Sequence, residues 1–513
     1  MRKAGSARLI LVTAAVLLAI PQLSFAYLDE AWLSGTDVKL LQGPGTIRLA
    51  GMGNLTIAIE DVNNQVDLYD FTGNVASLIF DKETNNADAW GTYSKWVDVK
   101  NGFRWQDFGV WQAGALSVLR GKDQYAGGAT ILTRVLDFTT LDDRSFRKAL
   151  GIAYPKSEVA YLDSTKIDME AVGTIVQGYY AHKTYDFLYV GAKGWGEFEG
   201  EKKNKELRYE VLNDCNYLGA GAAAVAVPSK WVRIGASYDL GSQIVESKSS
   251  DPFHNDVYSR KRAVPTYAAQ ALFTLWGKVR GVFNYQHSSY DTDQTLHINW
   301  SDRYVLNPMG IDIDRKLKVG SESFGSDFVA TRWITHELAG VPVTLSAYFD
   351  MTDQDSRYTP EPNALVWMDA FDQSLREWNL GAGVSYGFMG KGLVGAECLF
   401  NRGRVDDHLA LSTDSEYTNF KEINVKGGGE YRVLPWLAVR AGYCRSTEQR
   451  FMGVPEQDFA SNAFSAGLGC LLKGGNLTVD TAFTQKTSKP EKDLGYDLEE
   501  KDQTVMLYGR YLF

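Results

Sequence analysis

The feature that most constrains the fold is a strand–turn–strand unit that repeats from residue 216 to residue 513. In each unit, two stretches of alternating apolar and polar residues are joined by a few residues, and a longer polar loop follows. In residues 343–351, for example, the odd-numbered positions are apolar. A period of two over this length predicts a β-strand with one dry and one wet face. The apolar odd-numbered residues of this stretch are Val343, Leu345, Ala347, Phe349 and Met351.

The connections between the strands are of two kinds. Short ones, such as Met389-Gly390-Lys391 and Lys473-Gly474-Gly475, contain glycine or proline, which supply the backbone angles of tight turns. Short turns at one end and long loops at the other are typical of outer-membrane barrels, in which the short turns are periplasmic. A soluble antiparallel sandwich does not need a dozen hairpin-linked strands of this kind. We therefore predict an all-β protein, a transmembrane antiparallel up-and-down β-barrel.

The number of strands follows from counting the alternating stretches. Fifteen can be placed, and because single-chain bacterial barrels have even counts, at least one more is expected within 105–163. We predict about 16 strands, with 14 and 18 as the neighbouring counts, and a barrel domain at 105–513. The predicted strands are 168–181, 184–198, 216–227, 231–245, 265–275, 279–288, 326–338, 342–351, 377–388, 392–401, 420–432, 437–446, 462–472, 476–486 and 502–513.

The first 26 residues have the pattern of a secretory signal peptide. Arg2, Lys3 and Arg8 precede an apolar run at 9–20, and Ser24-Phe25-Ala26 offers small residues at the two cleavage-site positions. The apolar run is shorter than the roughly 20 residues of a spanning helix. We expect export and a mature chain from Tyr27, in the outer membrane of a Gram-negative cell.

The last strand carries the expected insertion signal. Val505, Leu507, Tyr511 and Phe513 share one of its faces. An alternating apolar strand that ends on phenylalanine resembles the strand by which the barrel-assembly machinery recognises its substrates. We therefore assign the insertion signal to Tyr511 and Phe513.

The charge balance bears on partners. The chain has 53 basic and 63 acidic residues, a net charge of −10, which argues against nucleic acid. Acidic loops suit contact with lipopolysaccharide through divalent cations, beside the lipid of the membrane itself. The simpler alternative is that the acidity aids solubility.

Charged residues on the wet faces of the strands are expected to line the lumen, because they cannot face hydrocarbon cheaply. Both signs are interleaved, so these residues either pair and brace the barrel or form a hydrated path. The set is Arg233, Asp239, Arg280, Asn284, Asp350, Glu377, Glu397, Lys426, Glu430, Arg432, Arg440 and Arg510.

No pattern in the chain indicates catalysis. The six histidines are scattered and none has a partner at catalytic spacing. There is no phosphate-binding, haem-attachment or metal-ligand motif. We expect neither an enzyme nor a cofactor or metal site.

The connection at 352–376 differs from the other long loops. Leu365, Trp367, Met368 and Phe371, with Leu375, recur at helical spacing after two prolines. Such a stripe either collects an apolar ligand or packs on the neighbouring loops.

Residues 27–104 lack the hairpin repeat. They contain Gly51-Met52-Gly53, then Ala58 with Glu60-Asp61, then Asn74-Val75-Ala76-Ser77-Leu78. This order resembles the start of the FadL-type transporters of long-chain fatty acids and hydrophobic compounds, and of the related PorV-type barrels, over roughly residues 40–80. Val75 stands where that family has proline, and Ser77 where it has glycine.

The resemblance implies that residues 27–104 fold into the barrel as a hatch, with Gly51, Gly53, Asn74 and Ala76 as hatch residues, and that a kink in the wall lets apolar ligands leave sideways. The alternative is an ordinary first strand and turn. The implied function is passive passage of a small apolar substrate across the outer membrane. The other functions open at this point are a general porin, or a barrel that acts as a scaffold or sheath in a secretion or electron-transfer complex.

Overall fold

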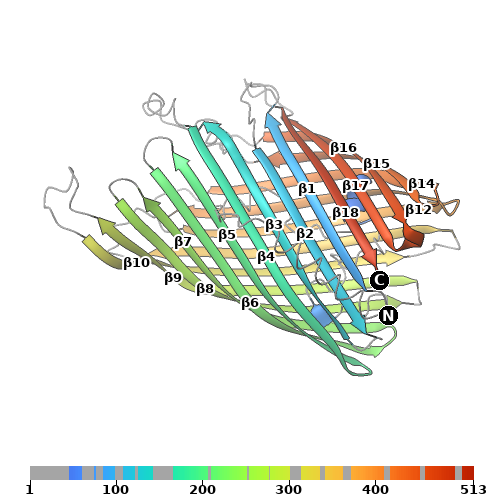
Figure 1. Cartoon of the computed structure of the whole chain (residues 1–513), viewed down its shortest axis with the longest axis horizontal. Helices are drawn as coiled ribbons and strands as arrows, with labels where there is room; N and C mark the ends of the chain where they lie inside the picture. Colours follow the sequence, from blue (N-terminus) through green and yellow to red (C-terminus); the bar gives the residue numbers. More distant parts are fainter. Residues whose placement is uncertain are drawn as a thin grey trace.

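The computed structural model shows one barrel wall with a short N-terminal segment inside it (Figure 1). It describes residues 46–59, 74–76, 85–98, 108–121, 125–142, 166–205, 209–250, 254–275, 278–300, 313–335, 341–361, 371–409, 416–450, 457–490 and 499–513. The signal peptide predicted at 1–26 lies outside the described residues. No helix within the described residues is long and apolar enough to cross a membrane.

The wall is a single antiparallel sheet in which each strand pairs with its neighbours in sequence. The sheet closes because β1 pairs with both β2 and β18. Closure leaves no edge strand, so every strand satisfies its main-chain groups within the wall, as hydrocarbon demands. The strands are β1 (Asn86–Asp98), β2 (Phe108–Gly121), β3 (Tyr125–Asp142), β4 (Lys166–Tyr185), β5 (Leu188–Lys205), β6 (Tyr209–Ser229), β7 (Val232–Ser250), β8 (His254–Leu275), β9 (Val279–Trp300), β10 (Ile313–Thr335), β11 (Val343–Pro360), β12 (Phe371–Phe388), β13 (Gly392–Leu409), β14 (Glu416–Leu434), β15 (Leu437–Arg450), β16 (Gln457–Leu472), β17 (Leu477–Pro490) and β18 (Glu500–Leu512).

The described wall has 18 strands, so the prediction of about 16 was too low. The region 105–163 supplies two strands, β2 and β3, where at least one was expected. The segment 27–104 was predicted to lie wholly inside the barrel, but its part Asn86–Asp98 is wall strand β1. The turn between the predicted strands 168–181 and 184–198 falls instead between Tyr185 and Leu188, because β4 is longer than its alternating stretch.

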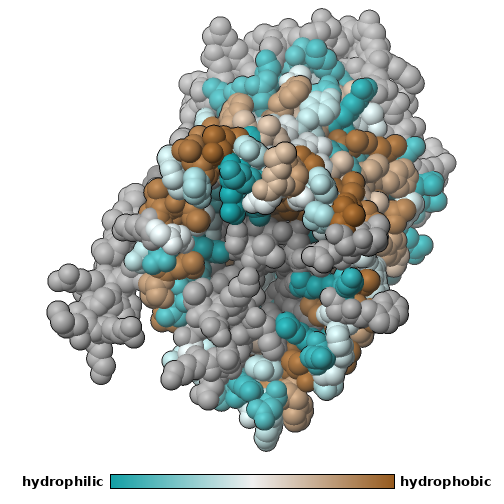
Figure 2. All heavy atoms as spheres, turned by 90° about the vertical axis from the view of Figure 1, so that its right-hand side faces the viewer, coloured by the Kyte–Doolittle hydropathy of each residue, from teal (hydrophilic) through white to brown (hydrophobic). Residues whose placement is uncertain are grey.

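The alternation predicted from sequence matches the two faces of the wall. In β11, Leu345, Phe349 and Met351 are exposed on the outer surface, while Ser346 and Asp350 are buried on the inner one. In β18, Val505 and Leu507 face outward and Met506, Tyr508 and Arg510 inward. Apolar side chains are accordingly visible on the outside of the molecule beside polar ones (Figure 2). The chain is thus an outer-membrane type of β-barrel with an apolar outer belt.

The short turns lie where glycine predicted them. Met389 (φ 53°) and Gly390 (φ 62°) both take left-handed angles between β12 and β13, the combination that a two-residue hairpin turn with the correct twist requires. Gly474 (φ 68°) and Gly475 (φ 101°) do the same after β16, in the 3-10 turn η2 (Lys473–Gly475).

The strands are much longer than the membrane is thick. A transmembrane strand needs about 9–11 residues, whereas β9 has 22 and β10 has 23. Because the ends at Val279 and Thr335 carry the short connections, the excess length lies on the side of the long loops. The outer parts of β9 and β10 therefore stand beyond the bilayer.

Candidate functional site

The described N-terminal residues lie against the inner face of the wall. Helix α3 (Thr46–Gly51) touches strands β15 to β18, and its Ile47 and Ala50 pack on Ala482 and Met506. Residues 52–59 continue across the inner faces of β14, β13 and β12. Leu55 and Ala58 are buried almost completely.

Glycines in the wall make room for this segment. A Cβ on Gly383 would lie 2.7 Å from the Cα of Ala58, and Cβ atoms on Gly428 and Gly442 would overlap the main chain of Met52 and Gly53. Gly381, Gly395 and Gly467 also face the segment. Such close approach of two backbones is possible only where side chains are absent. We call these six wall glycines, Gly381, Gly383, Gly395, Gly428, Gly442 and Gly467, the glycine floor.

Charged side chains of the wall hold the segment by its main chain. One carboxylate oxygen of Glu397 accepts hydrogen bonds from the N–H groups of Ile57 (2.7 Å) and Ala58 (3.0 Å). Lys426 donates to the other Glu397 oxygen (2.9 Å) and to the carbonyl of Asn54 (3.1 Å). Arg332 donates to the carbonyl of Ile57 (3.0 Å). Successive N–H groups converging on one carboxylate form an anion-binding arrangement.

An ion-pair chain fixes helix α3. Arg48 binds Glu430 through two hydrogen bonds of 3.0 and 3.1 Å. Arg440 donates to the same carboxylate (2.6 Å) and pairs with Asp480 (2.5 Å). The two acids and two cations alternate, so this largely buried chain is neutral as a whole.

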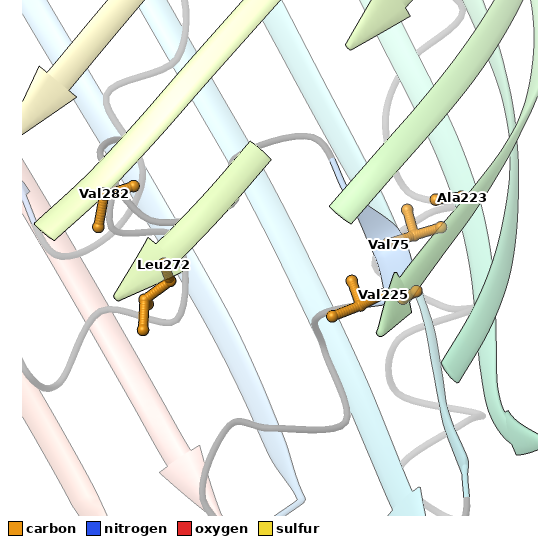
Figure 3. Packing of buried hydrophobic residues seen from close by; sticks show 6 residues of the cluster. Val75, Ala223, Val225, Leu272 and Val282 are labelled. Atoms are coloured by element: carbon orange, nitrogen blue, oxygen red, sulfur yellow. The ribbon is translucent and has the colours of Figure 1, made fainter. Parts of the chain in front are cut away.

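A second part of the N-terminal segment contacts the opposite side of the wall. Val75 lies beside Ala223 and Val225, and Ala76, Leu272 and Val282 complete the same buried apolar cluster (Figure 3). The Asn74 side-chain amide donates to the carbonyls of Ala224 and Ala236, and its oxygen accepts the N–H of Ala76. A Cβ on Gly191 would lie 2.7 Å from Val75. The structure thus places all four predicted hatch residues, Gly51, Gly53, Asn74 and Ala76, inside the barrel.

These contacts share one end of the barrel. Glu430, Arg440 and Arg332 lie a few residues from the short turns, as do Val225 and Leu272. The described N-terminal residues therefore occupy the end of the lumen that carries the short turns, the periplasmic end by the rule for such barrels.

The other predicted lumen residues also lie at inward positions. Asp239 pairs with Lys193 (2.8 Å), Asp350 accepts a hydrogen bond from Asn379 (2.8 Å), and Glu377 accepts one from Asn401 (2.5 Å). Arg510 pairs with Asp88. Arg233, Arg280 and Asn284 are half-buried, whereas Arg432 is exposed at the end of β14, away from the buried chain.

Sequence reasoning missed several partners in the site. Arg332, Asp480 and Lys193 sit at inward positions of alternating strands, so the same rule could have found them, whereas Asp88 lies on β1, which has no such alternation. Arg48 lies in a segment without a period, and no signal indicated its role.

The wall is interrupted at one place in the described ladders. Strands β8 and β9 pair from His254 to Arg260 and again from Thr266, but not between. Pro265 has no N–H to donate there. The Thr292 hydroxyl instead donates to the Lys261 carbonyl.

Polar groups line this interruption on the lumen side. The Arg262 guanidinium stacks on Tyr290 (4.5 Å), bonds to Gln243 and lies 3.6 Å from Glu322. On the outer face, Asp291 and Asp293 are exposed. The resemblance implies a wall kink that opens to apolar surroundings, but this interruption lies above the apolar belt and is lined by charges.

A polar cavity of about 480 Å³ adjoins the interruption and is lined by Asp291, Ser321 and Arg357 among others. Near it, Lys318 bridges Asp293 (2.8 Å) and Glu361 (3.2 Å). The hydrogen bonds to these carboxylates raise the pKa of Lys318, so its charge persists at any physiological pH.

The loop expected at 352–376 is shorter than predicted. Residues up to Pro360 belong to β11, and Phe371 begins β12, so the helical spacing of Phe371 and Leu375 is coincidental. Leu365, Trp367 and Met368 lie outside the described residues. Among the residues that the structure describes, no cluster of histidine, cysteine and carboxylate side chains could hold a metal ion.

Comparison with known proteins gives likeness in fold only. No family model and no curated protein sequence matches the chain. Solved structures that resemble it include a Pseudomonas aeruginosa FadL homologue (12% identity, 92% of this chain and 99% of that one, TM-score 0.37). The Pseudomonas putida toluene transporter TodX is similar at 11% identity, with 92% and 98% covered and a TM-score of 0.36.

A second kind of barrel is also similar. The ferric yersiniabactin uptake receptor FyuA from Yersinia pestis matches at 9% identity, with 84% of this chain and 80% of that one covered and a TM-score of 0.44. FadL-type transporters and siderophore receptors are thus both among the structural neighbours. At these identities and scores neither supports a substrate or a mechanism.

Proposed function

We propose that this barrel is an outer-membrane transport protein through which small hydrophobic substrates pass passively, with the N-terminal segment as a hatch at the periplasmic end of the lumen. The observation that carries the proposal is the seating of residues 46–59 inside a closed 18-strand wall, where Glu397, Lys426 and Arg332 hold their main chain.

The size of the wall supports a pathway. Barrels of 16–18 strands are wide enough to leave an aqueous channel. A wall of this size that served only as a structural element would not need an internal segment. Residues 46–59 and 74–76 contact opposite parts of the wall, so N-terminal residues occupy the bore from two sides.

The hydrophobic nature of the substrate rests on the sequence resemblance of residues 40–80. A hydrophobic substrate would not leave readily through the β8–β9 interruption, because the charged residues Asp291, Asp293 and Arg262 line this part of the wall. We therefore propose passage along the barrel axis, past or through the hatch.

Single-channel recording in planar bilayers tests the proposal. The intact protein should conduct ions poorly, and a variant lacking residues 46–78 should conduct strongly while keeping its heat-modifiable migration on gels. The wall survives the deletion because its strands bond to one another. Large, steady channels from the intact protein would contradict the hatch.

Substrate class needs a separate measurement. Liposomes containing the protein should take up a hydrophobic compound such as toluene faster than empty liposomes, and a sugar of similar size should show no such difference. Uptake of the sugar alone would point to a general porin.

A general porin is the second candidate, and the inward charges favour it. Asp239, Asp350 and Glu377 line a hydrated surface rather than an apolar one. If the intact protein conducts and passes sugars, the charged lumen is the transport path and the N-terminal segment is only a brace.

A further inference from the structure

We infer that the inner face of strands β10 to β16 is a peptide-binding groove, and that its ligand is the chain's own residues 46–59, which can leave and rebind as one unit. The inference rests on the proposed function in one respect, namely that this segment is removable. It adds the nature of the site: a groove that recognises a peptide main chain.

Past helix α3, three charged side chains of the wall bind main-chain atoms of the segment. Glu397 accepts two consecutive N–H groups, and Lys426 and Arg332 each donate to a carbonyl. Three separate wall strands, β10, β13 and β14, supply these side chains. Contacts of this kind satisfy buried backbone groups that would otherwise lack partners.

The glycine floor sets the shape that the groove accepts. Gly442 and Gly428 bring the wall backbone against Met52 and Gly53. Gly53 has φ +84°, and an added Cβ would lie 3.2 Å from the main-chain nitrogen of Tyr443. Only glycine meets both the angle and the space at this position. The groove therefore selects a peptide with glycine at its turn and small or slender residues beside it.

The segment is independent of the wall's own hydrogen bonds. It forms no strand, and the 18-strand ladder closes without it. Its departure would therefore break side-chain contacts with the wall, including the Arg48–Glu430 ion pair, but none of the ladder bonds that hold the wall.

In the empty groove, each wall acid that binds the segment would still have a cation of the wall beside it, with Arg440 shared between Glu430 and Asp480. Glu397 keeps Lys426 at 2.9 Å, and Glu430 keeps Arg440 at 2.6 Å. Removing one partner of a buried ion pair is costly because the other charge stays buried without compensation. This pre-paired arrangement is what a reversible site needs.

The test uses a synthetic peptide of residues 46–59 with blocked ends and a fluorescent label. It is titrated into a purified variant that lacks those residues, and binding is followed by anisotropy. We expect saturable binding. Gly442→Leu, which fills the floor, and Glu397→Ala, which removes the main-chain acceptor, should each weaken binding at least tenfold. Gln286→Ala, a change at an inward position outside the groove, should leave it unchanged.

A matched peptide and the full-length chain give independent readings. The peptide with Gly53→Val should not bind, because valine opposes the positive φ. In the full-length protein, Gly442→Leu should make the amide hydrogens of residues 46–59 exchange rapidly while those of β12 to β16 stay protected.

Several outcomes would overturn the inference. They are a deletion variant that cannot assemble, a peptide that does not bind, binding that Gly442→Leu leaves intact, and a full-length Gly442→Leu protein whose segment stays protected. Conductance separates this inference from the proposed function. Peptide rebinding without any change in conductance would contradict the hatch alone, whereas a conductance rise without rebinding would contradict the groove alone.

Discussion

Arg510 and Asp88 face each other across the two strands that close the barrel. They are register partners on β18 and β1, joined by two hydrogen bonds of 3.1 Å, and the Asp88 side chain is fully buried. The pair thus joins the last wall strand to the first. Two charges in this setting stabilise only while both are present.

Asp88→Ala should therefore weaken closure, because it leaves the Arg510 charge buried without its partner, at a cost of about 3–5 kcal/mol. The measurement is the temperature at which the barrel loses its compact migration on gels. The double variant Asp88→Leu/Arg510→Met should recover most of the loss. A double variant as weak as the single one would show that the pair does not act as a unit.

Strand β1 also shows where sequence reasoning fails. Its outward positions include Ala87, Ala89 and Gly91, which are too small to give an apolar period. Its Trp90 faces inward, because helix α3 brings an apolar cluster to that side of the wall. Alternation detects strands whose residues are apolar on the lipid side and polar on the other side. The residues of β1 do not show this difference between its two faces.

The outer face gives a second prediction. Ala347→Arg places a charge toward hydrocarbon at the fifth residue of β11, about midway along the roughly 9–11 residues that span the membrane from the short-turn end, and should cost about 2–4 kcal/mol. Assembly into the outer membrane, scored by heat-modifiable migration, should fall sharply. Equal assembly of wild type and variant would mean that Ala347 does not face lipid.

The control for this change needs an inward position with free space. Ser346 faces inward as predicted, but it is buried, and its hydroxyl donates to the Gly383 carbonyl (3.3 Å) close to Ala58. An arginine there would collide with the N-terminal segment, so alternation alone overstates its tolerance. Gln286, inward and exposed on β9, is the better site, and Gln286→Arg should assemble normally.

The β8–β9 interruption gives a third prediction. Thr292→Val removes the hydroxyl that donates to the Lys261 carbonyl in the absence of a ladder bond. Hydrogen exchange in residues 261–264 should become faster, while that of residues 266–275 stays slow. The melting of the whole barrel should change little, because β7 continues to pair with β8. Unchanged exchange at 261–264 would mean that this hydroxyl does not hold the two strands together.

Part of the candidate site could be predicted from the sequence. Glu397, Lys426, Glu430 and Arg440 follow from the rule that charges on alternating strands face the lumen. What they bind does not follow, since Glu397 accepts main-chain N–H groups, which no side-chain pattern records. Alternation places a residue on a face but does not identify the segment that lies against that face.

The ion-pair chain at helix α3 gives the last prediction, because its two arginines should differ in effect. Arg48→Met leaves Glu430 with Arg440, so the wall should lose only the hydrogen bonds to Arg48, about 1.5–3 kcal/mol of contact with residues 46–59. Arg440→Met leaves Asp480 without this cation and Glu430 with Arg48 alone, and should lower wall stability by about 3–5 kcal/mol. Arg48→Met should therefore increase protease cleavage within residues 46–59 but change the melting temperature of the barrel little. Arg440→Met should lower the melting temperature of the barrel itself. Equal melting temperatures for the two variants would mean that the ion-pair chain only binds residues 46–59 and does not brace the wall.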